Sequence, residues 1–218
     1  MKKLLLLLLF AFTSQLLPAQ QKPAFYDDVQ KFKELDKKIP PPQNSILFIG
    51  SSSFTMWPDV QEYFPGYPII NRGFGGSSLT HLIYYFNDLV PPYNPKQIII
   101  YCGENDLAND ATPADSVVNR FKRLFTMIRD YDKKVPVAYV SMKPSPSREK
   151  YLSKFKVANK KIKRFLWWKR NAKYINIYDA MLDASGKPRE DIFLNDRLHM
   201  NKEGYKIWQQ IIHPYLKK

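Results

Sequence analysis

Ile46-Leu47-Phe48-Ile49-Gly50-Ser51-Ser52-Ser53 is the most informative stretch of this chain for its architecture. Its apolar run has no polar alternation and is halted by a glycine, which is typical of a short strand buried on both faces of a sheet. Comparable runs follow at residues 68–71, 97–102, 135–140 and 174–177. The sequence therefore predicts several buried strands of one sheet, with serines at the end of the first.

Stretches with helical spacing separate these runs. The clearest is residues 114–131, where apolar side chains recur every three or four positions behind Thr112-Pro113, a favourable helix start. Residues 149–169 and 202–215 show the same spacing. Buried strands that alternate with amphipathic helices predict a parallel sheet covered on both faces, so we expect a three-layer α/β/α sandwich over residues 46–218. In such a fold, ligands bind at the carboxyl ends of the strands.

The first residues have the pattern of an export signal. Met1-Lys2-Lys3 is followed by an apolar run, residues 4–12, that is too short to span a bilayer, and Leu17-Pro18-Ala19 is a suitable cleavage site. We expect residues 1–20 to be a signal peptide, residues 21–45 to be an N-terminal extension, and the exported chain to be periplasmic or secreted. The alternative is an uncleaved membrane anchor, but no later segment has the length for a stable membrane span.

The chain carries a single cysteine, Cys102, and a formal net charge of +14. One thiol excludes an internal disulfide and a zinc site built from several cysteines, and its place in an apolar run predicts a small buried side chain. Eleven Lys or Arg residues lie between Arg148 and Lys173, opposed only by Glu149. This basic helix, residues 148–173, is expected either to be solvated or to contact an anionic surface. The sequence has no nucleic-acid-binding motif, and export also argues against such a partner.

Three polar motifs directly follow three of the predicted strands. They are Gly50-Ser51-Ser52, Asn71-Arg72-Gly73-Phe74-Gly75-Gly76 and Gly103-Glu104-Asn105-Asp106. Because the carboxyl ends of parallel strands lie at one edge of a sheet, these loops should converge there. A serine at a strand-to-helix junction lies near amides that favour negative charge, although serine is also a preferred helix N-cap.

A fourth motif, Asp196-Arg197-Leu198-His199, precedes the last predicted helix. Its spacing can place the carboxylate against one imidazole nitrogen, so that the other nitrogen is free to accept a proton from a serine. The alternative is that Asp196 belongs to a turn and that His199 only packs. Of the other histidines, His81 lies on a predicted helix and His213 lies near the end of the chain, and a structural role is expected for both.

Gly76 and Asn105 supply the neutral donors that an oxyanion needs. A glycine lets its backbone amide approach a substrate oxygen, and an asparagine amide donates without adding charge. Either residue could instead serve only a turn. Serine, base, carboxylate and donors together favour ester hydrolysis, whereas a metal-dependent phosphoesterase would need a dense cluster of His, Asp and Glu that the sequence lacks. We expect no cofactor and no metal.

The four motifs, in this order, resemble those of the SGNH hydrolases, also called GDSL-type esterases and lipases, over nearly all of the chain beyond the signal segment. The resemblance implies a flavodoxin-like fold and a carboxylic ester hydrolase that needs no metal. It implies that Ser52 is the nucleophile, Asp196 the orienting acid and His199 the base. The oxyanion donors would be the amides of Ser52 and Gly76 together with the side chain of Asn105.

One departure from that family concerns its usual Gly-Asp-Ser, which is Gly50-Ser51-Ser52 here. The missing carboxylate is neither nucleophile, base, orienting acid nor oxyanion donor in the resemblance. Its replacement by serine leaves three neighbouring serines. Ser52 is chosen by its register after Gly50, and Ser51 and Ser53 are the alternatives.

The function expected from these residues is that of an exported serine esterase that acts on short-acyl esters, such as acetyl esters, through an acyl-enzyme intermediate. Its substrate would be a small molecule or a glycan ester. The alternative is a non-catalytic protein of the cell envelope that keeps the fold and binds an anionic polysaccharide through its basic helix. Trp57, Phe74 and Tyr84 could line a pocket, but core packing is expected for most of them.

Overall fold

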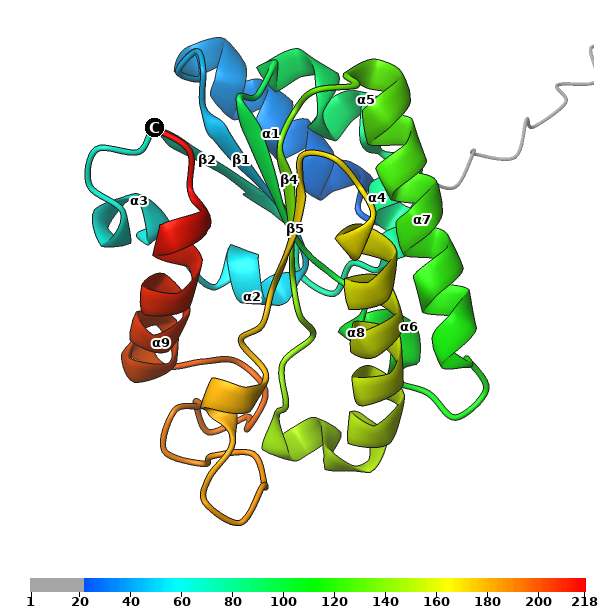
Figure 1. The fold of residues 1–218 in the computed structure, drawn as a ribbon. Coiled ribbons are helices and arrows are strands. Elements are labelled where there is room, and N and C mark those ends of the chain that lie inside the picture. The colour runs from blue at the N-terminus through cyan, green and yellow to red at the C-terminus, as the bar shows by residue number, and fades with distance from the viewer. Residues whose placement is uncertain (1–21) are drawn as a thin grey trace, which may run out of the picture.

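The structure is a computed structural model that describes residues 22–218, so the signal peptide predicted for residues 1–20 lies outside the described part. Five parallel strands form one sheet in the order β2-β1-β3-β4-β5 (Figure 1). Their bounds are Ile46–Gly50 for β1, Ile69–Gly73 for β2, Gln97–Tyr101 for β3, Val137–Val140 for β4 and Ala172–Ile175 for β5. The five predicted strands are confirmed. The last lies two residues earlier than expected, because Asn176 accepts from the Tyr178 amide in a turn.

Helices cover both faces of the sheet and confirm the predicted three-layer sandwich (Figure 1). One face is covered by α1 (Tyr26–Lys38), α4 (Leu79–Tyr84), α5 (Phe86–Leu89), α7 (Ala114–Tyr131) and α8 (Leu152–Trp167). The other face is covered by α2 (Ser52–Thr55), α3 (Val60–Tyr63) and α9 (Lys202–Ile212). The short helix α6 (Glu104–Leu107) follows β3. Short 3-10 helices are Pro91–Tyr93, Pro146–Tyr151, Asp179–Met181 and His213–Tyr215.

Alternate side chains of each strand enter different cores. In β3, Ile98 and Ile100 belong to the core beneath α7 and α8, whereas Ile99 and Tyr101 belong to the core beneath α9. Every residue of β1 and β3 is buried. This burial on both faces explains why the strands read as continuous apolar runs without alternation.

The helix α1 was not expected, because only the side chain of Val29 is buried in it. Polar and apolar contacts attach α1 to the rest of the fold. Asp36 accepts hydrogen bonds from Arg72 of β2 and from the Tyr93 hydroxyl, and Val29 enters the core beneath α7. Residues 22–45 therefore share the core of the rest of the chain.

The strand order places a switch point between β1 and β3. The chain leaves β1 for the outer strand β2 and then returns to the other side of β1, so the loops after β1 and β3 diverge at the point where ligands bind in such sheets. Gly50 and Tyr101 are paired at this point. A Cβ on Gly50 would lie 1.9 Å from the Tyr101 carbonyl oxygen, so only glycine fits there.

Among residues 22–218, no helix combines the length and the apolar character needed to cross a membrane.

Candidate active site

The first predicted motif turns from β1 directly into α2, which begins at Ser52. The Ser51 amide donates to the Tyr101 carbonyl at 3.0 Å and holds the turn against β3. Ser51 and Ser53 are buried, with exposed fractions of 4% and 1%, whereas Ser52 is partly exposed. Ser52 is thus the one hydroxyl of the three that a solvent-borne substrate can reach.

The backbone amides at this edge that lack an acceptor include those of two residues predicted to bind an oxyanion. Within residues 22–218, the amides of Ser52 and Gly76 have no hydrogen-bond acceptor. Gly76 has a φ of 77°, a left-handed conformation that glycine adopts without strain. The Ser52 amide also lies at the start of a helix, where backbone N–H groups favour negative charge.

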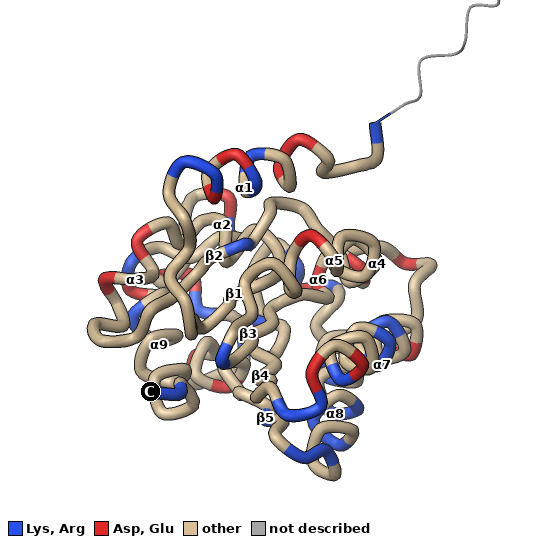
Figure 2. The backbone as a smooth tube through the Cα atoms, turned by 90° about the horizontal axis from the view of Figure 1, so that it is seen from above, with Lys and Arg blue, Asp and Glu red and all other residues tan. Residues whose placement is uncertain are grey.

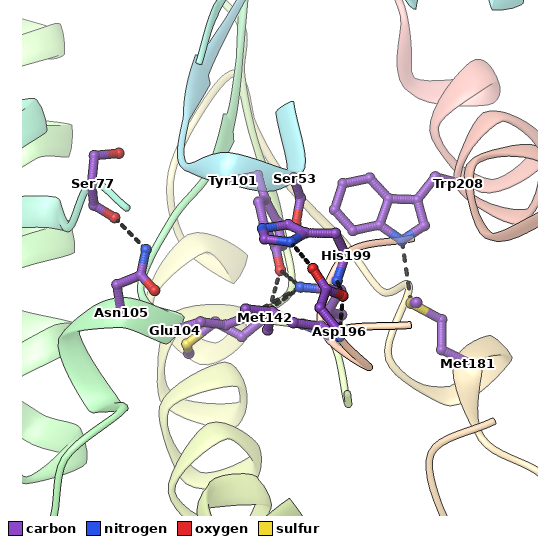
Figure 3. Close-up of polar contacts among 12 residues, drawn as sticks. Ser53, Ser77, Tyr101, Glu104, Asn105, Met142, Met181, Asp196, His199 and Trp208 are labelled. Atoms are coloured by element: carbon purple, nitrogen blue, oxygen red, sulfur yellow. Dashed lines mark hydrogen bonds and ion pairs between the residues drawn. The ribbon is translucent and has the colours of Figure 1, made fainter. Parts of the chain in front are cut away.

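Ser77, which the sequence analysis did not single out, joins three of the loops. Its hydroxyl donates to the Gly50 carbonyl at 3.1 Å, and its own carbonyl accepts from Asn105 Nδ2 at 2.9 Å (Figure 3). Ser77 is fully buried, and its bonds link the turn after β1 to the loops that follow β2 and β3. The Asn105 amide keeps its second N–H for another acceptor. The only signal in the sequence was a small polar residue directly after the two glycines.

Asp196 and His199 are brought together, as the spacing predicted. Asp196 Oδ1 accepts from the backbone amides of Leu198 and His199, both at 2.9 Å, and Oδ2 lies 2.6 Å from His199 Nδ1 (Figure 3). Burial acts to raise the pKa of Asp196, but the hydrogen bonds from the His199 amide, the His199 side chain and the Leu198 amide outweigh it and lower this pKa to about 2. Asp196 is therefore an ionised acceptor that orients the imidazole.

The other imidazole nitrogen, His199 Nε2, is buried and has no hydrogen-bond partner among residues 22–218. In the view of Figure 3, the ring extends from Asp196 towards α2. The Tyr205 hydroxyl of α9 donates to the Ser53 carbonyl at 2.8 Å and so fastens the C-terminal part of the chain to α2. No hydrogen bond joins the Ser52 hydroxyl to His199 in this structure. A buried nitrogen without a partner is costly, and such groups often mark a functional role.

The remaining histidines have structural surroundings. His81 Nδ1 accepts from the Ser78 amide at 3.0 Å at the start of α4, and burial lowers the His81 pKa. His213 follows α9 and stacks on Phe64 with ring centroids 6.4 Å apart. Among residues 22–218, no group of three or more His, Cys, Asp or Glu side chains is arranged to hold a metal ion.

A buried charge pair lies directly beneath the third motif. Lys143, just after β4, places Nζ 3.0 Å from Glu104 Oε2 and 3.2 Å from the Tyr101 hydroxyl, and its amide donates to Glu104 Oε1 at 3.0 Å. The Tyr101 hydroxyl donates to the same carboxylate, and burial, followed by the Glu104 charge, raises the Tyr101 pKa. Lys143 was not among the residues predicted from the sequence, although its place after a strand was a usable signal.

Asp106, the last residue of the third motif, has a structural role. Its Oδ2 accepts from the Leu79 amide at 2.9 Å at the start of α4, and its Oδ1 accepts from Arg120 of α7 at 2.8 Å. Burial raises the pKa of Asp106, although these two bonds oppose the shift. The carboxylate therefore fastens α6 to two neighbouring helices.

The three aromatic residues considered for a pocket differ in their burial. Trp57 and Phe74 are buried in the two cores, with exposed fractions of 0% and 1%, whereas Tyr84 is 64% exposed. Phe25, which precedes α1, was not considered, yet its ring lies 3.7 Å from the point where a Cβ on Gly76 would be. This ring therefore packs beside Gly76. Cys102 is buried, as predicted.

Comparisons with known proteins show the family and the fold of this chain. The model of the GDSL-like Lipase/Acylhydrolase family matches residues 48–207. Similar solved structures include a GDSL-like lipase from Bacteroides thetaiotaomicron, with a TM-score of 0.73, 20% identity and coverage of 86% of this chain and 96% of that chain. A catalytic mutant of Axe2, an acetylxylan esterase from Geobacillus stearothermophilus, has a TM-score of 0.63 and 13% identity, covering 79% and 93% of the two chains. A search of curated proteins finds no match.

Proposed function

Because this chain belongs to the GDSL-like lipase/acylhydrolase family and is a carboxylic ester hydrolase, we propose that it is an exported serine esterase whose nucleophile is Ser52. The accessibility of Ser52 between two buried serines supports this choice. The carboxylate that the family usually carries at position 51 is replaced by a buried serine. In this chain the turn is held by the hydrogen bond from the Ser51 amide to the Tyr101 carbonyl.

The single observation that carries the mechanism is the hydrogen bonding of the two ring nitrogens of His199. Its Nδ1 is held by an ionised Asp196, so the neutral ring carries its proton on Nδ1 and leaves the lone pair of Nε2 free. Nε2 is enclosed and unpartnered within residues 22–218. In this proposal the Ser52 hydroxyl donates to this nitrogen when a substrate binds, since catalytic hydrogen bonds often form only in the complex.

In the proposed reaction, Ser52 Oγ attacks the ester carbonyl carbon while His199 Nε2 takes the serine proton. The bond to the alcohol oxygen then breaks, and the imidazolium returns its proton to the departing alcohol. Water attacks the acyl-serine, gives one proton to His199 and releases the carboxylic acid with Ser52 restored. Asp196 remains ionised throughout and stabilises the imidazolium.

The negative oxygen that forms at the carbonyl needs donors fixed in advance. The amides of Ser52 and Gly76 have no acceptor within residues 22–218, and Asn105 keeps one free N–H while the other binds Ser77. All three donors are neutral, so they favour the charge that develops during the reaction over the uncharged ester. We propose that these three groups form the oxyanion hole.

We propose short-acyl esters, acetyl esters first, as the substrates. The acetylxylan esterase Axe2 and a carbohydrate esterase of family 3 from Talaromyces cellulolyticus have the same fold, the latter with a TM-score of 0.62 and 15% identity. In this chain, the Phe25 ring beside Gly76 occupies space next to the proposed oxyanion hole. A bulky neighbour at that point favours a small acyl group.

The test compares Ser52→Ala with its matched controls, Ser51→Ala and Ser53→Ala, on p-nitrophenyl acetate in the presence of EDTA. We expect Ser52→Ala to lower kcat/KM by a factor of about a thousand or more, while both controls keep most of the rate. A fluorophosphonate probe should modify the wild type on the peptide that contains Ser52. Full activity in Ser52→Ala, or a probe adduct on a neighbouring serine, would reject the assignment.

A further inference from the structure

Two adjacent tryptophans at the end of α8 are open to solvent. Trp167 is 76% exposed and Trp168 is 80% exposed, whereas the other two tryptophans of the chain, Trp57 and Trp208, are fully buried. Trp167 is the last residue of α8, and Trp168 is its C-cap. Large indoles left in water by a folded protein are unusual, because each costs free energy unless another surface covers it.

Cations surround these two indoles. We define the Trp-cation patch as Trp167 and Trp168 with Lys163, Arg164, Lys169, Arg170 and Lys173. Among residues 22–218, none of its five cations has an ion-pair partner within 4.0 Å. Figure 2 shows positive residues gathered along α8 and at the turn that leads from α8 into β5. The patch therefore offers uncompensated positive charge to an anionic partner.

Shallow hollows lie on both sides of the indole pair. One, of about 720 Å³, is lined by Trp168, Arg164 and Lys122 of α7. Another, of about 350 Å³, is lined by Trp167, Lys173 and Lys217. Each hollow combines one indole with basic side chains that can attract a phosphate group, and the one acidic residue, Asp115 in the first hollow, is paired with Lys161.

The patch and the proposed catalytic residues lie at opposite edges of the sheet. Four residues after Trp168, β5 begins at Ala172, which pairs with Val137 at the amino end of β4. Ser52 and Asn105 follow the carboxyl ends of their strands. The patch at the α8–β5 turn is therefore remote from the catalytic edge (Figure 1).

We propose that the Trp-cation patch docks this enzyme on the anionic phospholipid headgroups of a membrane. Tryptophan prefers the headgroup level of a bilayer, where its ring is buried and its N–H stays hydrated, and lysines nearby are attracted to anionic lipids. The indoles are exposed over most of their surface, so a membrane surface can cover both of them. Insertion and charge attraction together supply the two interactions that stable peripheral binding requires.

This orientation has a consequence for the substrate. A protein docked through the α8–β5 turn holds its catalytic edge away from the lipid, towards the aqueous side. The enzyme would therefore act on esters in solution or on a polymer beside the membrane, and not on the acyl chains of the bilayer to which it is bound.

The experiment is sedimentation of the purified protein with phosphatidylcholine vesicles that contain about 30% phosphatidylglycerol, against pure phosphatidylcholine vesicles. We expect binding to the anionic vesicles only, and weakening as salt is raised, because screening reduces the attraction. Vesicles with brominated acyl chains should quench the fluorescence of the exposed tryptophans, while Trp57 and Trp208 remain unquenched in the core. No quenching on binding would overturn insertion.

Two variants test the patch. Lys163→Gln, Lys169→Gln and Lys173→Gln together should weaken binding roughly a hundredfold, and Trp167→Ala with Trp168→Ala roughly tenfold or more. The matched control replaces three exposed lysines of α1, Lys31, Lys37 and Lys38, with Gln, which changes the net charge equally and should leave most binding intact.

Thermal unfolding and hydrolysis of p-nitrophenyl acetate should be unchanged in all of these variants, because the substituted side chains are exposed and remote from Ser52. Equal losses of vesicle binding in the patch and control variants would show that binding depends only on net charge, and would overturn the proposal. Binding to polygalacturonate but not to anionic vesicles would also overturn it, and would assign the patch to an anionic polysaccharide instead.

Discussion

Lys143 Nζ lies 3.0 Å from Glu104 Oε2, and this ion pair is enclosed one residue before Asn105, the proposed oxyanion donor. The side chains are 1% and 6% exposed, so neither charge is solvated by bulk water. The Lys143 amide also donates to the Glu104 carboxylate, which joins the segment after β4 to α6. The position of Asn105 thus depends on a charge pair that sequence spacing did not indicate.

Lys143→Met should destabilise the protein by about 3–5 kcal/mol, because it leaves the Glu104 carboxylate buried without its countercharge. Urea unfolding of the purified variant measures the loss. The control is Lys150→Met, which breaks an exposed ion pair with Asp110 and should change stability little. The double variant Lys143→Met with Glu104→Gln should recover part of the loss. Equal stability of Lys143→Met and wild type would show that the pair contributes nothing net.

Asn105→Ala should lower kcat by roughly a hundredfold on p-nitrophenyl acetate, because one donor to the transition-state oxyanion is lost. It should also cost about 1 kcal/mol of stability, since the hydrogen bond to the Ser77 carbonyl is lost as well. Asn109→Ala, which removes a hydrogen bond to the Asp106 carbonyl in the next loop, is the control. An unchanged kcat in Asn105→Ala would leave Asn105 with a turn role only.

Acidification should lower kcat/KM, because a protonated imidazole cannot accept the Ser52 proton. The low pKa of Asp196, about 2, keeps this carboxylate ionised at neutral and mildly acidic pH, so a loss of rate in that range is not caused by protonation of Asp196. Asp196→Asn should lower the rate by about 10³ to 10⁴, because the imidazole is no longer held in the tautomer that leaves Nε2 free to accept a proton. A flat pH profile of the wild type would contradict His199 as the base.

Phe25→Ala should broaden the acyl selectivity, because it opens space beside Gly76. The measurement is the ratio of kcat/KM for p-nitrophenyl butyrate to that for the acetate, which we expect to rise. Phe32→Ala, which removes a ring of α1 that packs against Arg72, is the control for loss of α1 packing. The same ratio in Phe25→Ala as in wild type would remove Phe25 from the acyl-binding wall.

The strands and the main helices could be predicted because their burial leaves a local trace. A strand buried on both faces needs a continuous apolar run, and a helix on one face needs apolar residues every three or four positions. Helix α7 has the predicted bounds, Ala114–Tyr131. Helix α1 leaves almost no such trace, because it buries only Val29 and is attached mainly through Asp36.

The bond between Asp196 and His199 was also predictable, since three residues of separation in a turn suffice to form it. The exposure of Trp167 and Trp168 could not be predicted in this way. Two consecutive residues of a helix point in directions about 100° apart, and only the neighbouring elements determine which of them is covered. Here the helix ends at Trp167 and neither indole is covered.

The sequence alone predicts the parallel sheet, the helices on both of its faces and the edge at which the polar motifs lie. These features can be predicted because apolar periodicity is a local property of the chain. Only the tertiary structure shows contacts between residues that are far apart in the sequence. Ser77 joins three loops, Lys143 neutralises Glu104, and His199 Nε2 is enclosed without a partner within residues 22–218. Hydrogen bonds and desolvation act over a few ångströms in space, and separation along the chain does not encode that distance.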